Sequence, residues 1–172
     1  MDGISLRAMD RALLHEYYKG FERDPEIFAD MSLLRDYRYS PEGVDAYFDR
    51  LAAQKDRKDF LILLDGRPIG EIALKHMDAK EKRCELSVHL QNDSVKNRGI
   101  GTRAERLMLD YAFKTLGMET VTADTVPKNG RSRHILQKLG FRETGRDDTF
   151  IFYELSRADW LKNAPDGSAS SL

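Results

Sequence analysis

The sequence predicts an α/β fold in which helices flank a largely antiparallel set of strands, and three observations support this class. The first third of the chain carries apolar residues at helical spacing. Three strand-like runs then follow one another with short polar turns, residues 59–64, 69–77 and 83–91, which is typical of an antiparallel meander. A loop with two glycines, residues 96–102, joins the last of these runs to a strongly amphipathic helix.

Length and composition indicate one globular domain. The chain has 172 residues, of which 41% are hydrophobic and 33% are charged. This length is enough to enclose a hydrophobic core, and no linker or internal repeat interrupts the chain. We therefore expect a single domain over residues 1–162. Residues 163–172 are rich in small residues and carry no core residue before the terminal Leu, so we expect a disordered tail there.

Charge, hydropathy and cysteine content disfavour several classes of protein. The net charge of −1 argues against general nucleic-acid binding, which usually needs a basic surface. No apolar run approaches the length of a membrane span, and the first residues lack the pattern of a signal peptide. The single cysteine, Cys84, excludes an internal disulfide and a cysteine metal cluster, and its alternating surroundings predict a core position. We expect a cytoplasmic protein without metal, nucleic-acid or membrane partners.

The first third of the chain is predicted as one strand followed by helices. Residues 4–9 can form a short strand, and Asp10 then caps a helix whose apolar residues recur at helical spacing up to residue 21. Residues 25–39 hold a looser helical pattern. Ser40 and Pro41 begin a third helix, because Ser is a favoured N-cap and Pro is favoured at the first helical position.

The meander follows, and its third strand has two distinct faces. Asp65 and Gly66 predict a tight turn between the first two strands. Within residues 83–91 every second side chain points the same way. The apolar face consists of Cys84, Leu86, Val88 and Leu90, and the polar face of Arg83, Glu85, Ser87 and His89.

The remaining elements alternate between helix and strand. The glycine loop leads into a helix over residues 102–116, which Gly117 ends. A β-branched run predicts a strand over residues 120–126, and a short helix is expected over 131–139. The chain closes with an antiparallel hairpin over residues 141–155, turning at residues 146–148, and a last helical turn over 156–161.

The glycine loop is the strongest indication of a ligand. Glycines let a backbone approach a ligand closely, and a helix that starts there offers unpaired N–H groups to a phosphate or diphosphate. Lys96 and Arg98 add positive charge, although a plain strand-to-helix turn would also use glycines.

Two nucleotide-binding motifs compete for this loop. The P-loop string is absent. A Rossmann fingerprint is formally present in Gly99, Gly101 and Ala104, with Asp124 downstream, but the preceding meander does not suit parallel crossovers. An NAD(P)-binding oxidoreductase is therefore the weaker alternative.

Two motifs resemble those of a known family. Lys96-x-x-Gly99-Ile100-Gly101 resembles the Q/R-x-x-G-x-G/A motif of the GNAT superfamily of N-acetyltransferases. About thirty residues later a second signature follows, formed by Asn129-x-x-Ser132, Lys138-Leu139-Gly140-Phe141 and Gly145. The chain looks most similar to the branch with ribosomal-protein alanine and polyamine acetyltransferases. It departs from the family pattern at Lys96, where Gln or Arg is commoner, at Gly130-Arg131 between Asn129 and Ser132, and at Leu136, where many relatives have tyrosine.

The resemblance implies a GNAT-like fold with acetyl-CoA as cosubstrate. Such a fold has a mixed, mostly antiparallel central sheet with flanking helices, splayed here between residues 83–91 and 120–126. Acetyl-CoA would lie in that gap, with its diphosphate on the N–H groups of the glycine loop and its pantetheine beside the third strand. The cofactor-binding residues that the resemblance implies are Val88, His89, Leu90, Lys96, Asn97, Arg98, Gly99, Ile100, Gly101, Thr102, Asn129 and Ser132.

The implied reaction is transfer of an acetyl group to a primary amine by direct attack in a ternary complex. The amine would be a small molecule, a polyamine or a protein N-terminus. For the general base we favour Glu85, acting through water, ahead of Glu71 and His89. For the proton donor we name Tyr153, with Ser132, His134 or water as alternatives. The alternative for each of these residues is a purely structural role, as a packed, solvated or ion-paired side chain.

The acceptor and the assembly are less defined by the sequence. The helical first third carries many carboxylates, which form either an attractive face for a cationic amine or simply a solvated surface. They are Glu22, Asp24, Glu26, Asp30, Asp36, Glu42, Asp45 and Asp49. We expect a monomer or homodimer. A non-catalytic acyl-CoA-binding or sensing module stays open as an alternative, because Leu136 replaces the tyrosine.

Overall fold

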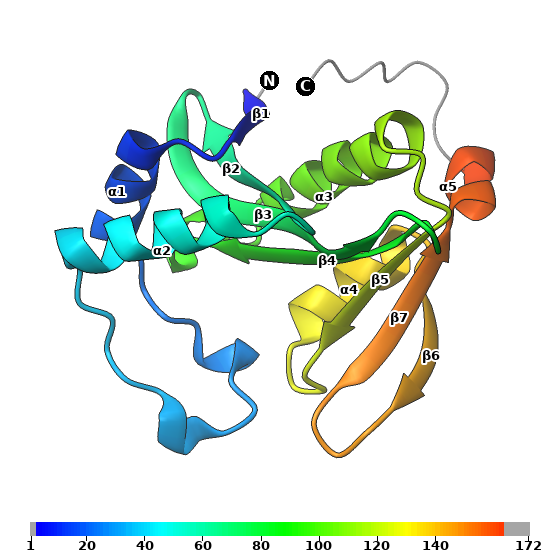
Figure 1. Ribbon diagram of the computed structural model, residues 1–172. Helices are drawn as coiled ribbons and strands as arrows, with labels where there is room; N and C mark the ends of the chain where they lie inside the picture. Colours follow the sequence, from blue (N-terminus) through cyan, green and yellow to red (C-terminus); the bar gives the residue numbers. More distant parts are fainter. Residues whose placement is uncertain (1–2, 164–172) are drawn as a thin grey trace.

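The computed structural model describes residues 3–163, in which seven strands form one sheet with helices on both of its faces (Figure 1). Short 3-10 turns and a π-helical turn, Tyr111–Thr115, connect or extend the regular elements. The strands and helices are, in chain order, β1 (Ile4–Ala8), α1 (Arg11–Lys19), α2 (Pro41–Ala53), β2 (Lys58–Leu64), β3 (Arg67–Asp78), β4 (Arg83–Leu90), α3 (Ile100–Asp110), β5 (Thr120–Thr125), α4 (Gly130–Lys138), β6 (Arg142–Arg146), β7 (Ile151–Ser156) and α5 (Arg157–Asn163).

The sheet is mixed and mostly antiparallel, which confirms the predicted fold class. Its strand order is β1-β2-β3-β4-β5-β7-β6, and β4–β5 is the parallel pair. The predicted turn between β2 and β3 is present, because Asp65 and Gly66 adopt φ values of 50° and 83°, as the favoured two-residue hairpin turn requires. The Rossmann alternative is wrong, since its doubly wound parallel sheet is not the sheet formed by residues 3–163.

The pairing between β4 and β5 stops early. It joins Arg83 to Thr120, Cys84 to Val121 and Glu85 to Thr122, although β4 continues to Leu90 and β5 to Thr125. Figure 1 shows the two strands diverging beyond this point. The second half of β4 therefore has a backbone edge without a partner strand on the β5 side, and the predicted splay is confirmed.

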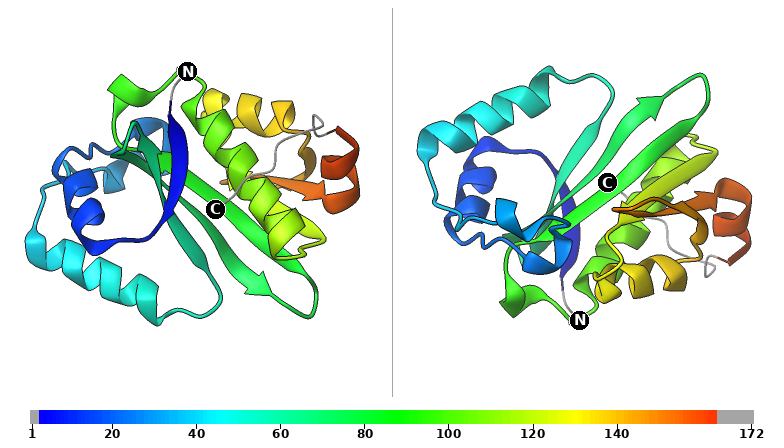
Figure 2. Two further views of the ribbon diagram at one scale, coloured as in Figure 1. Left: turned by 90° about the horizontal axis from the view of Figure 1, so that it is seen from above. Right: turned by 90° about the horizontal axis from the view of Figure 1, so that it is seen from below.

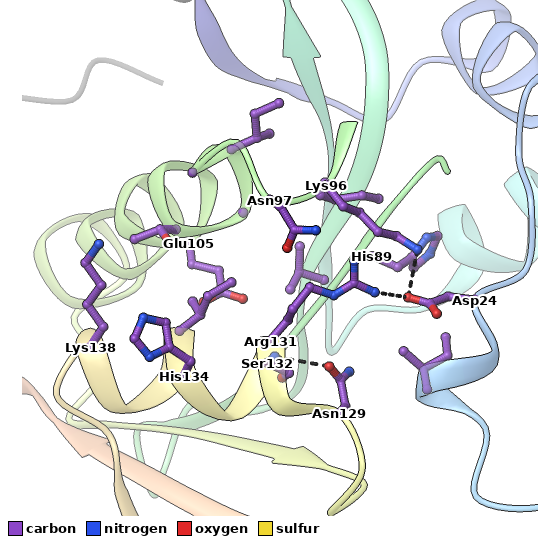
Figure 3. Close-up of a pocket in the computed structure, with 18 of the residues that line it drawn as sticks. Asp24, His89, Lys96, Asn97, Glu105, Asn129, Arg131, Ser132, His134 and Lys138 are labelled. Atoms are coloured by element: carbon purple, nitrogen blue, oxygen red, sulfur yellow. Dashed lines mark hydrogen bonds and ion pairs between the residues drawn. The ribbon is translucent and has the colours of Figure 1, made fainter. Parts of the chain in front are cut away.

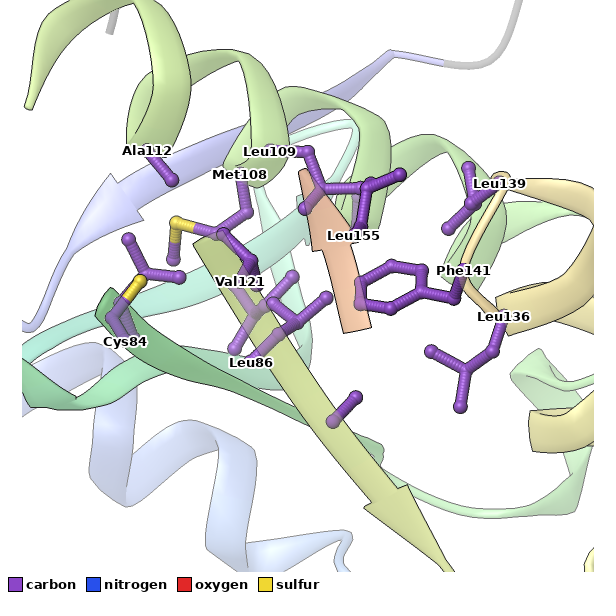
Figure 4. Packing of buried hydrophobic residues seen from close by; sticks show 14 of the residues in the cluster. Cys84, Leu86, Met108, Leu109, Ala112, Val121, Leu136, Leu139, Phe141 and Leu155 are labelled. Carbon is purple, nitrogen blue, oxygen red and sulfur yellow. The ribbon is translucent and has the colours of Figure 1, made fainter. Parts of the chain in front are cut away.

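Two hydrophobic clusters hold the layers together. Helix α3 covers one face of the sheet, and α1 and α2 cover the other (Figure 2). The larger cluster lies between α3 and the sheet and includes Cys84, Met108 and Val121 (Figure 4). Burial raises the pKa of the Cys84 thiol to about 12, so this residue stays protonated and belongs to the core, as predicted. The smaller cluster lies beneath α1 and α2.

Residues 25–39 do not form the expected helix. They contain two single 3-10 turns, Pro25–Ile27 and Met31–Leu33, separated by extended backbone. Asp24 and Asp30 each accept the backbone N–H two residues further on at 2.9 Å, and such local bonds compete with helix formation. The apolar side chains of the two turns remain exposed, so burial of an apolar face does not compensate.

Two boundaries differ from the expected ones. Helix α3 begins at Ile100 rather than at residue 102, because Gly99 turns the chain in the left-handed region directly before it. Helix α5 extends to Asn163, which the sequence had placed in the tail, and buried Trp160 fixes it by donating to the Asp110 carboxylate at 2.8 Å. The rest of the predicted tail, residues 164–172, lies outside the described residues.

Candidate functional site

A cavity of about 390 Å³ opens where β4 and β5 separate. Its walls come from the segment after α1, the end of β4, the glycine loop, the first turns of α3 and helix α4 (Figure 3). Of the twelve residues predicted to bind the cofactor, all except Arg98 line this cavity. The structure thus brings together two motifs that lie about thirty residues apart in the sequence.

The glycine loop presents backbone N–H groups to the cavity. Asn97 and Gly99 both adopt left-handed backbone conformations, with φ values of 59° and 72°. Gly99 is also the N-cap of α3 and makes no side-chain hydrogen bond to the first turn of the helix. The helix therefore offers uncapped N–H groups and the positive end of its dipole beside the cavity. This arrangement suits a diphosphate.

Lys96 does not supply the free positive charge that the sequence suggested. Its Nζ donates to Asp24 Oδ2 and to Asp93 Oδ1, both at 2.8 Å, and its side chain is only 8% exposed. Arg131 also contacts Asp24 Oδ2, at 3.1 Å (Figure 3). Burial opposes ionisation of Asp24, but these cations lower its pKa below the usual value. Lys96 thus ties the loop to residues that follow α1.

Helix α4 contributes side chains that the sequence analysis missed. Its N-cap, Asn129, accepts the N–H of Ser132 at 3.1 Å, and both line the cavity as expected. Four further lining residues follow at helical spacing: Arg131, His134, Ile135 and Lys138. Because residues at this spacing lie on one face of a helix, the sequence could have predicted that they line the cavity together.

Glu105 was also missed. It lies one turn after Gly101 on α3, lines the cavity and is 4% exposed. Its Oε2 atom is buried without a hydrogen-bond partner, and burial raises the pKa of the carboxyl group to about 8. The side chain is therefore mostly a neutral acid near pH 7. Its spacing of four from Gly101 is the signal that could have found it.

A second cavity of about 410 Å³ adjoins the first. The two share Phe21, Ile27 and His89 in their walls. Aromatic side chains from α1, α2 and the segment between them dominate the second cavity, among them Tyr18, Tyr37 and Tyr47. Two separate ligands could thus meet at the shared wall.

A buried carboxylate lies behind this wall. Glu71 is 5% exposed and accepts hydrogen bonds from the hydroxyl groups of Tyr18 and Tyr47, at 2.5 and 3.1 Å. Its Oε2 atom is 3.0 Å from Nε2 of His89, whose Nδ1 is 2.8 Å from the Tyr17 hydroxyl. Burial opposes ionisation, but these partners lower the pKa of Glu71. Glu71 is therefore an ionised group that polarises the tyrosines of the second cavity.

The two predicted catalytic residues do not line either cavity. Glu85 is the last residue of β4 that pairs with β5, and its carboxylate lies 3.3 Å from Nζ of Lys75 and 3.7 Å from Nε2 of His76. Tyr153 is 1% exposed in the main core, and its buried hydroxyl has no hydrogen-bond partner among the described residues. Their roles stay predictions. Leu136 is buried in the same core.

The predicted acidic face does not surround the second cavity. Asp45 and Asp49 bind Arg11 at 2.9 and 2.7 Å, and Asp45 also contacts His15 at 2.9 Å. Asp24 is held by Lys96 and Arg131, and Asp30 caps a turn. Within residues 3–163, no carboxylate lines the second cavity. These carboxylates therefore do not form the wall of this cavity, and their attraction of the acceptor stays a prediction.

Residues 3–163 contain neither a cluster of metal-ligating side chains nor a helix that could span a membrane. No group of three or more His, Cys, Asp or Glu side chains within residues 3–163 is arranged to hold a metal ion. None of the helices in that range combines the length and the apolar character needed to cross a membrane.

The amino-acid sequence is similar to a family of acetyltransferase domains and to several of its members. A family model described as an acetyltransferase (GNAT) domain matches residues 4–142. The chain is 26% identical over 125 residues to the spermidine N(1)-acetyltransferase of Escherichia coli strain K12, covering 73% of this chain and 60% of that protein. It is 28% identical over 109 residues to the putative ribosomal N-acetyltransferase YdaF of Bacillus subtilis, covering 58% and 59%. The chain thus spans about 60% of the length of these relatives.

Solved structures show the same fold. The spermidine N-acetyltransferase of Vibrio cholerae, in a complex with CoA and spermine, superposes with a TM-score of 0.74 over 92% of this chain and 98% of that chain, at 15% identity. A dodecameric structure of the Vibrio cholerae enzyme superposes with a TM-score of 0.72, also at 15% identity, over 94% of this chain and 98% of that one. At this level of identity the likeness concerns the arrangement of the elements.

Proposed function

The chain belongs to the family of GNAT acetyltransferase domains, and from this premise we propose that it transfers the acetyl group of acetyl-CoA to a primary amine. The observation that carries the proposal is the early end of the β4–β5 pairing beside the uncapped start of α3. The first cavity is lined by Val88, His89 and Leu90, from the part of β4 beyond the pairing, and by the first residues of α3. The unpaired edge of β4 can hydrogen-bond the amide groups of pantetheine as a neighbouring strand would, and the α3 N-terminus can hold the diphosphate.

The second cavity is the proposed place of the amine. It meets the first at His89, so an amine there would lie next to the donor. Tyr18 and Tyr47 donate to Glu71, which leaves their oxygen atoms polarised to accept hydrogen bonds from an ammonium group. Their ring faces also attract a cation. Glu71 therefore acts as a positioning residue behind the tyrosines, and both nitrogens of His89 are already engaged.

Acetyl transfer needs a proton acceptor, a donor to the carbonyl oxygen and a route for the thiol proton. Acetyl-CoA when bound supplies the thioester carbonyl. Holding both reactants in adjoining cavities removes much of the entropic barrier, with effective molarities of roughly 10⁵–10⁸ M in favourable cases. We propose Glu85, at the point where β4 and β5 separate, as the base through water. Backbone N–H groups near Val88 are proposed to stabilise the oxyanion.

Tyr153 is proposed as the proton donor to the thiolate. Its hydroxyl is buried and has no hydrogen-bond partner among the described residues. Because Tyr153 lines neither cavity in this structure, the proposal requires the thiol end of CoA to reach beyond the wall of the first cavity. Tyr153→Phe removes only this oxygen. We expect it to lower kcat with little change in the KM for the amine, because the ring and its packing stay. Equal turnover in both proteins would remove Tyr153 from the mechanism.

A thiol-release assay tests the proposed function. Acetyl-CoA is supplied with a panel of small amines, polyamines, aminoglycosides and peptides with free N-termini, and the released thiol is measured. We expect turnover with at least one amine class and none without protein. Calorimetry with CoA and with acetyl-CoA is run beside it. Folded protein that binds neither would refute the proposal, whereas binding without turnover would favour a non-catalytic acyl-CoA-binding module.

Two finer assignments belong with the proposal. We propose a cytoplasmic location, where acetyl-CoA is available and the single free thiol, Cys84, stays reduced. Fractionation of cells that express the chain tests this. We also keep the expectation of a monomer or homodimer, which light scattering of the purified protein tests directly.

A further inference from the structure

Two arginines are the charged groups at the mouth of the second cavity. Arg23 follows α1 and Arg38 precedes α2, and both line the cavity while being exposed. Neither makes a side-chain hydrogen bond or salt bridge within residues 3–163. Burial raises the pKa of Tyr37, another lining residue, and the charge of Arg23 acts against this rise, which shows that the guanidinium lies near the cavity wall. Both cations are therefore available to a ligand.

The charges at the two ends of this cavity differ in sign. At the inner end, the ionised Glu71 lies behind Tyr18 and Tyr47, where a cation is favoured. At the mouth, two guanidinium groups stand without a carboxylate among the lining residues. Of the carboxylates in the surrounding segment, Asp24 is bound by Lys96 and Asp45 by Arg11, and none lines this cavity. A ligand that fits this pattern carries opposite charges at its two ends.

We propose that the acceptor is a primary amine that also carries an anionic group, a carboxylate or a phosphate, bound at the cavity mouth by Arg23 and Arg38. This inference rests on the proposed function and names the substrate class of the same site. Arginine suits both anions, because its planar fork can donate two hydrogen bonds to either. The aromatic walls between the two ends favour an apolar spacer.

The same pattern disfavours a polyamine. A second ammonium group on the ligand would come to lie near two guanidinium groups, and like charges at the mouth would repel it. The polyamine enzymes among the relatives are therefore a guide to the fold and the donor, and the acceptor class differs. This is a statement about selectivity, which matched substrates can measure.

Four amines with the same four-methylene spacer provide the test. They are pentylamine, 5-aminopentanoate, 4-aminobutyl phosphate and 1,4-diaminobutane, whose far ends are neutral, carboxylate, phosphate and ammonium. We expect at least one anionic amine to exceed pentylamine in kcat/KM by about tenfold, as two exposed ion pairs allow, and 1,4-diaminobutane to fall below it. The two anionic arms show which anion the arginines prefer.

The double variant Arg23→Gln/Arg38→Gln isolates the arginines. We expect it to bring the ratio of kcat/KM for the anionic amine over pentylamine close to one. The matched control is Arg67→Gln/Arg142→Gln, which removes two exposed arginines that line neither cavity and leaves the same net charge. The control is expected to keep the ratio of the parent protein. A preference for 1,4-diaminobutane in the parent, or an equal loss of selectivity in both variants, would overturn the inference.

Equilibrium binding separates this inference from the proposed function. Each amine is titrated in the presence of CoA, with the heat of binding measured by calorimetry as the signal. Binding of an anionic amine that depends on Arg23 and Arg38 supports the inference even if no acetyl transfer follows, in which case the proposed function fails alone. Transfer to amines with no dependence on the two arginines gives the opposite result and rejects the inference.

Discussion

Glu105 is a buried carboxyl group on α3, with one oxygen atom that makes no hydrogen bond in the described structure. Such a group is costly to ionise, so the folded protein holds its proton to about pH 8, whereas an unfolded chain releases it near pH 4.5. The residue therefore links the stability of the fold to pH. It does so beside the cavity proposed for the donor.

Glu105→Gln tests this link. Below about pH 4.5 the acid is neutral in both states and costs nothing, and as pH rises towards 8 unfolding releases a proton, so the parent protein loses stability. The loss reaches at most about 5 kcal/mol above pH 8. The variant removes the titrating group, so its free energy of unfolding, from urea titrations at pH 5 and 8.5, should fall less between the two values.

The control for this prediction is Glu81→Gln, which changes an exposed carboxylate in the turn before β4. It should keep the pH dependence of the parent protein. If Glu105→Gln shows the same slope as this control, the Glu105 carboxyl group is not held protonated in the fold.

Glu71 and Glu85 should differ in the kinetic constant they control. Glu71→Gln weakens the polarisation of Tyr18 and Tyr47, so we expect a KM for the amine that is higher by about 10- to 100-fold. Glu85→Gln removes the proposed base, so we expect kcat to fall by roughly 10²–10⁴-fold and the pH profile to flatten. Steady-state kinetics across pH measure both. A large fall in kcat for Glu71→Gln, with normal kcat for Glu85→Gln, would exchange the two roles.

At the scale of elements, sequence patterns predict the structure well where the hydrogen bonds that fix it are made between residues close in the sequence. Asp10 and Ser40 were expected to cap helices and do so, because an N-cap bond is made within three residues. The glycine loop before α3 was also expected, and Gly99 adopts the left-handed backbone that favours glycine. The same locality explains a failure: residues 25–39 have apolar residues at helical spacing, but Asp24 and Asp30 satisfy the backbone first.

The role of α4 rests on its N-cap. Asn129→Ala removes the bond to the N–H of Ser132 and should lower the free energy of unfolding by about 0.5–2 kcal/mol. Because Asn129 and Ser132 both line the first cavity, CoA binding measured by calorimetry should weaken as well.

Asp10→Ala is the matched control, since Asp10 caps α1 with a 2.9 Å bond and lines neither cavity. It should lower stability to a similar degree and leave the dissociation constant for CoA unchanged. A loss of CoA affinity in both variants would mean that the effect comes from general destabilisation.

At the scale of the whole molecule, contacts between distant segments were beyond the reach of sequence reasoning. The glycine loop was identified, but its Lys96 is bound by Asp24, which lies 72 residues earlier. No pattern near either residue predicts this ion pair. The second cavity likewise collects side chains from α1, α2 and β4. The motifs therefore located the donor site, while the charges available in it and the shape of the acceptor site required the fold.

Occupation of the first cavity should stabilise the entire described fold. CoA at a hundred times its dissociation constant adds about 2.7 kcal/mol if it binds only the folded chain. For a protein of 172 residues this raises Tm by about 5–10 °C. Thermal unfolding with increasing CoA measures the shift, and NAD⁺ at equal concentration serves as the negative control. A larger shift with NAD⁺ would contradict the assignment of the loop.

The wall that the two cavities share has a consequence for how ligands affect each other. Phe21, Ile27 and His89 face both spaces, so a ligand that fixes them on one side prepares the surface met by the other. Thermodynamic reciprocity then applies. Whatever factor acetyl-CoA gives to the affinity for the amine, the amine must return to the affinity for acetyl-CoA. If the three side chains carry such a factor, the affinity for each substrate depends on the concentration of the other.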